Sequence, residues 1–376
     1  LFFEVKGRKI KSKPMKGTSR RGLNLIDDLK KKDELLNSVK NRAENVMIVD
    51  LIRNDLGRIS EYGSVLVPSL FEVEKYETVY QMVSTVQSRL GKNIRLSDVL
   101  KNIFPCGSIT GAPKIRTMEI INELEKESRG LYTGSIGLFI KDKMTFNVSI
   151  RTILLNKKSG KGEIGLGSGV VWKSNAQQEF SETKLKGRFL TQPINNFEII
   201  EKMLVKNREI SLLDLHLERL KETANHFLFV FDENKIRKLI DSIIKGSVTN
   251  DFVLRMTLNK WGIINYIVSD KTEITDKAKV IVSSKKIDPN NLSQYFKTTN
   301  RKLYNEQYNK YSQQGYFDVI FLNEKNEVAE GAITNILIKK NGRYFTPPVA
   351  SGILPGVYRS KLLSSIKNVF ETNLTL

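Results

Sequence analysis

The sequence predicts a protein of the α/β (α+β) class that contains two successive domains. Apolar residues make up 40% of the 376 residues and charged residues 27%, as in ordinary globular proteins. Segments with the alternating pattern of strands recur between amphipathic helical segments. The length is sufficient for two or three separate hydrophobic cores, and a break in pattern near residues 191–196 divides the chain.

The first half opens on a predicted hairpin, LFFEVKGRKI, over residues 1–10. A long amphipathic helix is expected from about Asp33 to Arg58. Its apolar face is formed by residues at helical spacing: Leu36, Val39, Ala43, Val46 and Met47. Strand patterns separated by turns then occupy residues 132–171, as GSIGLFI, MTFNVSIRTILL and GEIGLGSGVV. A charged helix over residues 177–190 is expected to close this half.

The second half begins after Gln192-Pro193, a pair that disfavours helix. We therefore predict one domain over residues 1–190, a linker over 191–196, and a second domain over 197–376. The second domain opens with a predicted strand–turn–strand, FEIIEKMLVKNREIS, and an amphipathic helix, DLHLERLKETANHFL. A further helix and several strands follow, and the polar stretch SKKIDPNNLSQ is expected to separate two lobes.

The composition excludes several classes of protein. The net charge of +20 comes mainly from lysines scattered among acidic residues, which predicts a solvated surface and no nucleic-acid partner. No apolar run is long enough to span a bilayer, and the N-terminal stretch lacks the features of a signal peptide. The single cysteine, Cys106, excludes a disulfide framework and predicts a reducing, cytoplasmic location.

Three carboxylates of the first half are candidate metal ligands. Glu44 lies within a predicted helix, and Glu179 and Glu182 are three residues apart, so a helix presents both on one side. Such carboxylates suit Mg²⁺, a hard cation that prefers oxygen ligands. From spacing alone, each is equally well explained as a solvated surface side chain.

The motifs around these carboxylates occur in a fixed order along the chain. They are PMKGT (14–18), AENVMIVDLIRNDLGR (43–58), PCGSITGAPKIRTMEII (105–121), GLYTGSIG (130–137), SIRT (149–152) and GSGVV (167–171). Over roughly residues 1–188 this order resembles the chorismate-utilising enzymes, which include anthranilate synthase and aminodeoxychorismate synthase. The resemblance implies a sandwich of antiparallel sheets with helices on the outside.

The same resemblance implies roles for particular residues. Glu44, Glu179 and Glu182 would surround the Mg²⁺ that is bound to chorismate. The substrate-binding residues would be Ser108, Tyr132, Arg151, Gly167 and Gly169. Within this set, the Arg side chain and the backbone of the two glycines would hold a carboxylate, since glycine lets N–H groups approach an anion closely.

Lys16 distinguishes the branches of this family. Anthranilate synthases have a small residue at this place in the motif, whereas aminodeoxychorismate synthases carry lysine. The implied chemistry is attack by Lys16, with its pKa lowered by burial, on the chorismate ring, with loss of the 4-hydroxyl and then displacement by ammonia. Gln81, in a segment expected to be helical, replaces the histidine of many relatives. No glutaminase Cys–His segment is visible, so a separate glutamine amidotransferase subunit or free ammonia is expected.

The second half carries the groups that a pyridoxal 5′-phosphate (PLP) enzyme needs. HLERL, KTTNR, EVAEGAITNI and SGILPGVYR occur in an order that resembles the fold-type IV enzymes, namely aminodeoxychorismate lyase and the branched-chain and D-amino-acid aminotransferases. The resemblance implies Lys297 as the PLP-bound lysine and proton carrier, and Glu330 as partner of the pyridine nitrogen. The phosphate-binding and supporting residues would be Arg219, Gly356, Val357 and Asn335. Tyr358 replaces a threonine common in relatives.

Together the two resemblances predict synthesis of 4-aminobenzoate for folate. Chorismate would be aminated to 4-amino-4-deoxychorismate in the first half, and pyruvate would be eliminated with PLP in the second. Two alternatives stay open: an anthranilate- or salicylate-type enzyme joined to a fold-type IV aminotransferase, and a non-catalytic basic binding module. The resemblance also allows a homodimer through the PLP domain.

The ends of the chain carry a further expectation. Relatives have a lobe before the P-x-K-G-T motif and further elements after the last helix. We therefore expect a fragment truncated at both ends, whose first half binds chorismate poorly.

Overall fold

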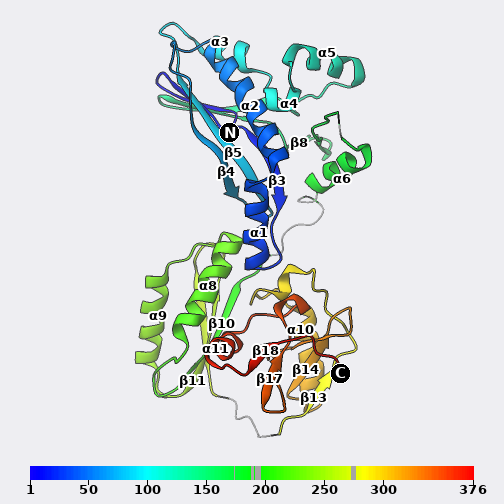
Figure 1. Cartoon of the computed structure of the whole chain (residues 1–376). Helices are drawn as coiled ribbons and strands as arrows, with labels where there is room; N and C mark the ends of the chain where they lie inside the picture. The colour runs from blue at the N-terminus through cyan, green and yellow to red at the C-terminus, as the bar shows by residue number, and fades with distance from the viewer. Residues whose placement is uncertain (173, 188–189, 191–195, 272–276) are drawn as a thin grey trace. The chain divides into compact units, whose positions relative to one another are not determined.

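The structure, a computed structural model, describes residues 1–172, 174–187, 190, 196–271 and 277–376. These residues form two compact units, and each is described by itself (Figure 1). The first unit contains residues 1–21 and the described part of 30–190, and the second contains residues 22–29 and the described part of 196–376. Residues 191–195 of the predicted linker lie outside the described residues.

A seven-stranded antiparallel sheet forms the centre of the first unit. Its strands are β1 (Phe3–Lys6), β2 (Lys9–Ser12), β3 (Met15–Arg20), β4 (Leu66–Lys75), β5 (Val79–Arg89), β6 (Ser135–Ile140) and β7 (Lys143–Val148). Their order is β3-β5-β2-β1-β7-β6, with β4 also paired to β5. The long strand β5 therefore pairs with β2, β3 and β4, and it connects the N-terminal hairpin to β3 and β4, while β1 pairs with β7 on the other side.

Helices and a small two-stranded sheet complete the first half of the chain. They are α1 (Leu25–Leu36), α2 (Val39–Gly57), α3 (Leu96–Ile103), α4 (Gly107–Thr110), α5 (Lys114–Leu124), α6 (Ala176–Lys186), β8 (Ile153–Leu155) and β9 (Gly162–Ile164). The predicted mixed class with antiparallel sheets is confirmed.

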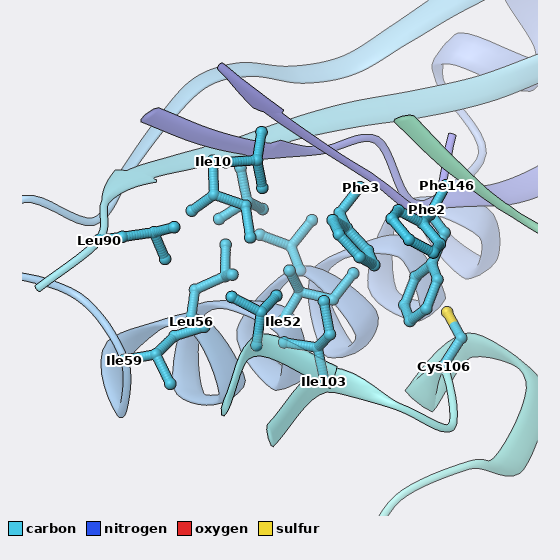
Figure 2. Close-up of a cluster of buried hydrophobic side chains, with 14 of the residues drawn as sticks. Phe2, Phe3, Ile10, Ile52, Leu56, Ile59, Leu90, Ile103, Cys106 and Phe146 are labelled. Atoms are coloured by element: carbon cyan, nitrogen blue, oxygen red, sulfur yellow. The ribbon is translucent and has the colours of Figure 1, made fainter. Parts of the chain in front are cut away.

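The core of the first unit lies between one face of the sheet and α2 (Figure 2). Alternation along β1 and β2 places Phe3, Val5 and Ile10 on the inner face, where each is at most 1% exposed. Ile52 and Leu56 of α2 belong to the same buried cluster. Burial of such side chains contributes about 1.5–3 kcal/mol each, which holds α2 on this face of the sheet.

The single helix predicted over 33–58 is wrong, because the chain forms two helices, α1 and α2. Ser38 separates them, and its hydroxyl accepts a hydrogen bond from the Asn41 amide at 3.3 Å, as an N-cap does. The predicted apolar face is also wrong, since Val39 is 82% exposed whereas Ile48 is 1% exposed. Val39 and Ile48 are nine residues apart, which is about two and a half helical turns, so their side chains lie on opposite sides of α2.

Other sequence expectations need smaller corrections. Gln81 lies in strand β5 and not in a helix. The predicted strand MTFNVSIRTILL is split into β7 and β8, and Arg151 between them has φ of 50°. The second strand expected after Val205 is reduced to an isolated bridge between Lys206 and Glu209. In each case, cross-strand pairing or turn geometry overrides the local pattern.

Sheets of three strands and their covering helices form the second unit. The first sheet is β10 (Ile199–Val205), β11 (Phe252–Leu258) and β12 (Ile264–Ser269), with helices α8 (Leu213–Phe227) and α9 (Glu233–Gly246). The others are β13 (Val280–Val282), β14 (Asp318–Leu322) and β15 (Val328–Gly331), and β16 (Ile338–Lys340), β17 (Arg343–Thr346) and β18 (Val369–Glu371). The remaining helices are η1 (Leu292–Gln294), α10 (Lys302–Ser312), η2 (Val349–Ser351) and α11 (Val357–Ser365).

Two separate buried clusters support this unit. One contains Ile199, Ile240 and Phe252, from β10, α9 and β11, and the other contains Val319 and Phe321 from β14. Within the described residues, no helix has the length and apolar character required to cross a membrane.

Candidate active sites

Lys16 lies in β3, and a glutamine on the neighbouring strand holds the residues that follow it. Gln81 donates from Nε2 to the Gly17 carbonyl oxygen at 2.8 Å, and it accepts from the Thr18 hydroxyl at 3.0 Å. Gly17 has φ of 90°, a conformation that favours glycine. The side-chain amide of Gln81 therefore fixes the backbone next to the candidate nucleophile.

The structure brings Lys16 to the Gly-Ser-Gly loop. A Cβ atom added to Gly169 would lie 3.2 Å from Nζ of Lys16, and one added to Gly167 would lie 2.6 Å from the Tyr132 hydroxyl. Burial raises the pKa of Tyr132, which keeps its hydroxyl protonated at neutral pH. Four of the sequence-predicted residues, from three separate motifs, thus meet at one loop.

The three predicted metal ligands are not assembled in the same way. Hydrogen bonds from Ser168 and Ser174 hold the pKa of Glu179 below its usual range. Glu182 forms an ion pair with Lys186 at 2.8 Å, while Glu44 lies half-buried on α2. Over the part of the chain that the structure describes, no group of three or more His, Cys, Asp or Glu side chains could hold a metal ion.

Ser108 and Arg151, predicted to bind substrate, lie in different surroundings. The Ser108 hydroxyl is 3.1 Å from the sulfur of Cys106, whose pKa burial raises. Arg151 is exposed and forms no ion pair with a described residue. Its guanidinium is therefore available to an anion from solution.

Two lysines of the first unit were given no role from the sequence. Lys186 donates from Nζ to the Gly167 carbonyl at 3.0 Å while it pairs with Glu182, so it links α6 to the Gly-Ser-Gly loop. Lys114 pairs with Asp55 at 2.6 Å in a mostly buried contact. Asp55 lies in the motif of residues 43–58 and Lys114 in the motif of residues 105–121, so the motifs themselves could have drawn attention to this ion pair.

In the second unit, Lys297 is a half-buried lysine next to strand β10. Its carbonyl oxygen accepts a hydrogen bond from the Ile200 amide at 2.7 Å. Burial, together with the positive charge of Arg219, lowers the pKa of Lys297 to about 8. Roughly a tenth of this amine is therefore uncharged at pH 7, far more than for an ordinary lysine, and is able to act as a nucleophile or a base.

Glu330, at the end of β15, is a buried acid with three hydrogen-bond partners. Its Oε2 accepts from the Leu354 amide at 3.1 Å and from Asn335 Nδ2 at 3.3 Å, while Tyr304 lies 2.9 Å from Oε1. Burial raises the pKa of Glu330 to about 8, so this carboxyl is protonated at neutral pH.

The Tyr304 hydroxyl connects Glu330 to a buried amide. It donates to Oε1 of Glu330 at 2.9 Å, and it is 2.6 Å from the side-chain amide of Gln294. The hydrogen bond from Tyr304 favours the ionised form of Glu330, but burial outweighs it.

Arg219, predicted to hold phosphate, is already engaged by a buried carboxylate. Its Nε and Nη2 donate to the two oxygens of Glu201 at 2.9 and 2.6 Å, and His216 Nδ1 is 2.7 Å from the same carboxylate. Burial alone would raise the pKa of Glu201, but these partners outweigh it and hold that pKa low. The sequence signal for Glu201 was an acidic residue on the buried side of β10, between Ile199 and Met203.

The N-terminus of α11 offers backbone donors at this site. Gly356 is its N-cap residue, Val357 is its first residue, and no side chain caps it. The Nδ2 atom of Asn335 donates to the Leu354 carbonyl at 2.9 Å and so supports the loop that precedes the helix. Free N–H groups at a helix N-terminus bind phosphate well.

Residues 1–192 match the family model described as chorismate binding enzyme, and residues 198–376 match the model described as Amino-transferase class IV. Aminodeoxychorismate synthase component 1 of Salmonella typhimurium is 43% identical over 52% of this chain and 43% of its own length. Anthranilate synthase component 1 1 of Haloarcula marismortui is 44% identical over 52% of this chain and 40% of its own. The chain thus spans well under half the length of these relatives.

Among solved structures, anthranilate synthase component I of Streptococcus pneumoniae is 38% identical, with a TM-score of 0.46 over 51% of this chain and 42% of that one.

Glu330→Gln should remove a pH dependence of stability in the PLP-free protein. Because folding raises the pKa of Glu330 from 4.5 to about 8, its stabilising contribution is complete below pH 4.5 and is lost as pH rises through 8. Gln is neutral throughout, so from pH 5 to 8 the variant should gain ~1 kcal/mol per pH unit relative to the parent. Denaturant unfolding at each pH measures this, with exposed Glu324→Gln as control. Parallel curves for the parent and Glu330→Gln would contradict it.

Gly356→Ala should weaken PLP binding at least tenfold. The added Cβ would lie 1.9 Å from Oδ1 of Asn335, so that side chain must move and lose its hydrogen bond to Leu354. Titration of PLP absorbance gives the affinity. Gly246→Ala is the control, because a Cβ there meets no atom within 4 Å. Equal PLP affinity in both variants would show that the close approach is not needed.

Proposed function

This chain belongs to the chorismate binding enzyme family and carries an Amino-transferase class IV region after it, and we propose that it makes 4-aminobenzoate. The first unit aminates chorismate to 4-amino-4-deoxychorismate. The second unit eliminates pyruvate from that product with PLP and leaves the aromatic amine. The position of Lys16 near Gly169 supports the proposal, because its amine lies close to the loop that would hold the substrate carboxylate.

In the first unit, Lys16 attacks the substrate ring and the 4-hydroxyl leaves as water after protonation. Ammonia then forms the new C–N bond and the lysine amine departs, so Lys16 is regenerated. The Gly167 and Gly169 backbone, with Arg151, would bind a carboxylate, while Tyr132 and Ser108 would line the pocket. Gln81 holds the Lys16 turn in place.

Magnesium stays a prediction for this unit. Glu44, Glu179 and Glu182 have the oxygen donors that Mg²⁺ prefers, but they do not form a metal-binding group in the part of the chain that the structure describes. We therefore derive no step through the ion.

The second unit fits PLP by the chemistry of its groups. A half-buried lysine with a lowered pKa, a buried acid and a helix N-terminus without a side-chain cap match its aldehyde, its pyridine nitrogen and its phosphate. When bound, PLP supplies an electron sink for bond breaking at the substrate. Lys297 would accept and return the proton, and Glu330 would be the partner of the ring nitrogen. Arg219, Gly356 and Val357 would hold the phosphate, and Asn335 supports their loop.

The proposal implies a source of ammonia. The Salmonella relative is named component 1, and we propose that a glutamine amidotransferase subunit supplies ammonia here as well. Cys106 does not replace it, because burial raises its pKa and disfavours the reactive thiolate. We further propose a cytoplasmic location, as the single cysteine predicts, and a homodimer through the second unit.

Anthranilate synthesis is the second candidate, since the Haloarcula relative is 44% identical. The position of the amino group on the product separates the two candidates. Lys16 favours the 4-amino product.

Lys297→Ala should lower lyase activity by at least a hundredfold, as expected for loss of a proton-transfer group. The full chain is given PLP and 4-amino-4-deoxychorismate, and 4-aminobenzoate and pyruvate are measured by chromatography. Lys302→Ala is the control, because the Lys302 side chain is 88% exposed. Transfer of an amino group without pyruvate release would assign an aminotransferase and contradict the lyase.

Lys16→Ala should abolish 4-amino product formed from chorismate and ammonia and leave the lyase reaction unchanged. Exposed Lys157→Ala is the control. Incubation at high chorismate concentration, with mass analysis of the product, measures the effect. Formation of the 2-amino isomer by the parent protein would establish the anthranilate candidate instead.

A further inference from the structure

The register of the first sheet aligns four cationic side chains in a row. Lys6 of β1 lies opposite Lys143 of β7 on one side and Lys9 of β2 on the other, and Lys9 lies opposite Arg89 of β5. Directly opposed residues project from the same face of a sheet, with Cβ atoms about 4.5–5.5 Å apart. Like charges in such positions repel, so this row costs stability unless an anion compensates it.

Acidic side chains compensate only the ends of this row. Glu4 pairs with Lys143 at 2.8 Å, and Glu61 is 3.4 Å from Arg89. Lys6 and Lys9, in the middle, form no ion pair with any described residue. The surplus positive charge is therefore concentrated on the hairpin.

A pocket of about 390 Å³ lies at the same end of the sheet. Its lining residues are Lys6, Arg8, Lys9, Ser64, Gln87, Ser88 and Arg89. No residue of either candidate active site lines it, and Glu61 is the acidic group bound to its wall. The volume falls in the range of small-molecule sites, about 300–1,000 Å³.

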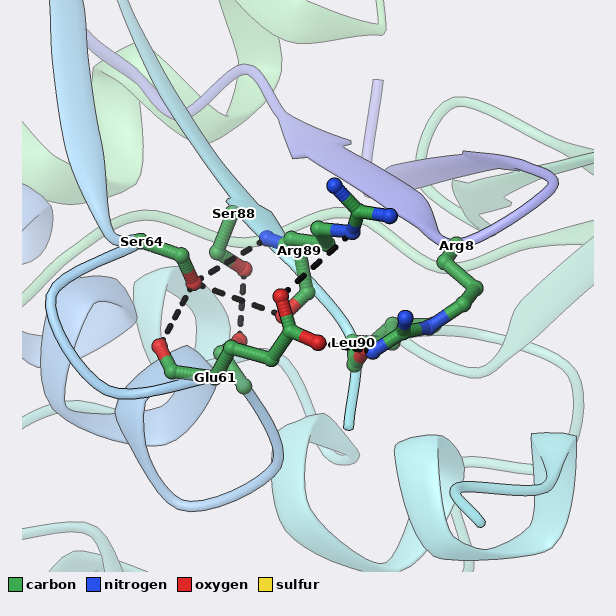
Figure 3. Close-up of polar contacts among 7 residues, drawn as sticks. Arg8, Glu61, Ser64, Ser88, Arg89 and Leu90 are labelled. Atoms are coloured by element: carbon green, nitrogen blue, oxygen red, sulfur yellow. Dashed lines mark hydrogen bonds and ion pairs between the residues drawn. The ribbon is translucent and has the colours of Figure 1, made fainter. Parts of the chain in front are cut away.

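The guanidinium of Arg8 is held in place beside this pocket. Its Nε donates to the Leu90 carbonyl at 3.0 Å, and its Nη2 contacts Glu61. Figure 3 shows the Glu61 carboxylate between Arg8 and Arg89. The hydrogen bond from Arg8, with the charges of Arg89 and Lys92, holds the pKa of Glu61 below its usual range. Glu61 thus orients both arginines through its ion pairs. Among the described residues, Nη1 of Arg8 has no hydrogen-bond partner.

We propose that this pocket binds a small oxyanion with two or more negative charges. Neighbouring strands are about 4.8 Å apart, so Lys6 and Lys9 can each reach one charged group of a ligand such as pyrophosphate or a polycarboxylate. The oriented Arg8 adds donors at the rim. This anion site is separate from the chorismate site and does not depend on the proposed function.

Calorimetric titration of the full chain with inorganic pyrophosphate, and separately with citrate, tests this proposal. We expect one saturable site per chain, weakened by added salt, because exposed charges are screened within about 10 Å at 0.1 M salt. The double variant Lys6→Gln/Lys9→Gln should lose at least tenfold in affinity. Lys157→Gln, an exposed lysine of the same unit, should stay within twofold of the parent.

The outcomes separate the ligand classes. Tighter binding of pyrophosphate assigns a phosphorylated ligand, and tighter binding of citrate assigns a polycarboxylate. Absence of saturable binding, or equal weakening by Lys157→Gln, would overturn the proposal. Without anion, the double variant should melt at a slightly higher temperature than the parent, since the repulsion is relieved. A lower melting temperature together with unchanged affinity would show that the row is only structural.

Discussion

Asn335 lies where any residue other than glycine at position 356 would place its Cβ atom, and this close approach sets the geometry of the second site. The Asn335 amide contacts both Glu330 and the Leu354 carbonyl, so one side chain connects the buried acid to the loop that begins α11. The Leu354 amide returns a hydrogen bond to the same acid. Glu330 and the loop that leads into α11 are therefore positioned by one small network.

The first unit uses glycine in a comparable way. Gly167 and Gly169 bring backbone close to Tyr132 and Lys16, which come from other motifs. Gln81 and Lys186 then hold the two sides of this loop region through carbonyl hydrogen bonds. Both candidate sites thus depend on backbone approached closely by side chains, an arrangement that larger residues would block.

The two units differ in the environment of their charged side chains. In the second unit, Lys297 and Glu330 are each displaced toward their neutral forms by burial, while Glu201 stays ionised because Arg219 and His216 surround it. Proton-transfer groups with pKa values near 8 suit chemistry at neutral pH. In the first unit, Lys6 and Lys9 of the hairpin remain exposed and repel one another. Such an arrangement is suited to binding an anion from solution.

The amino-acid sequence by itself determined the mixed class and the two family resemblances, and it singled out Lys16, Lys297 and Glu330 as candidate site residues, because these inferences depend on residue type and order along the chain. It did not determine the break at Ser38, which depends on a capping hydrogen bond. It also did not determine which face of α2 is buried, because packing against the sheet decides between the apolar faces that the helix offers. Only the tertiary structure decided which polar groups meet. Glu201 on β10 binds Arg219 on α8, and Lys6, Lys9 and Arg89 are aligned by the register of three strands. The contacts of Glu201 with Arg219 and of Lys9 with Arg89 join different elements of the chain, so local periodicity carries no information about them.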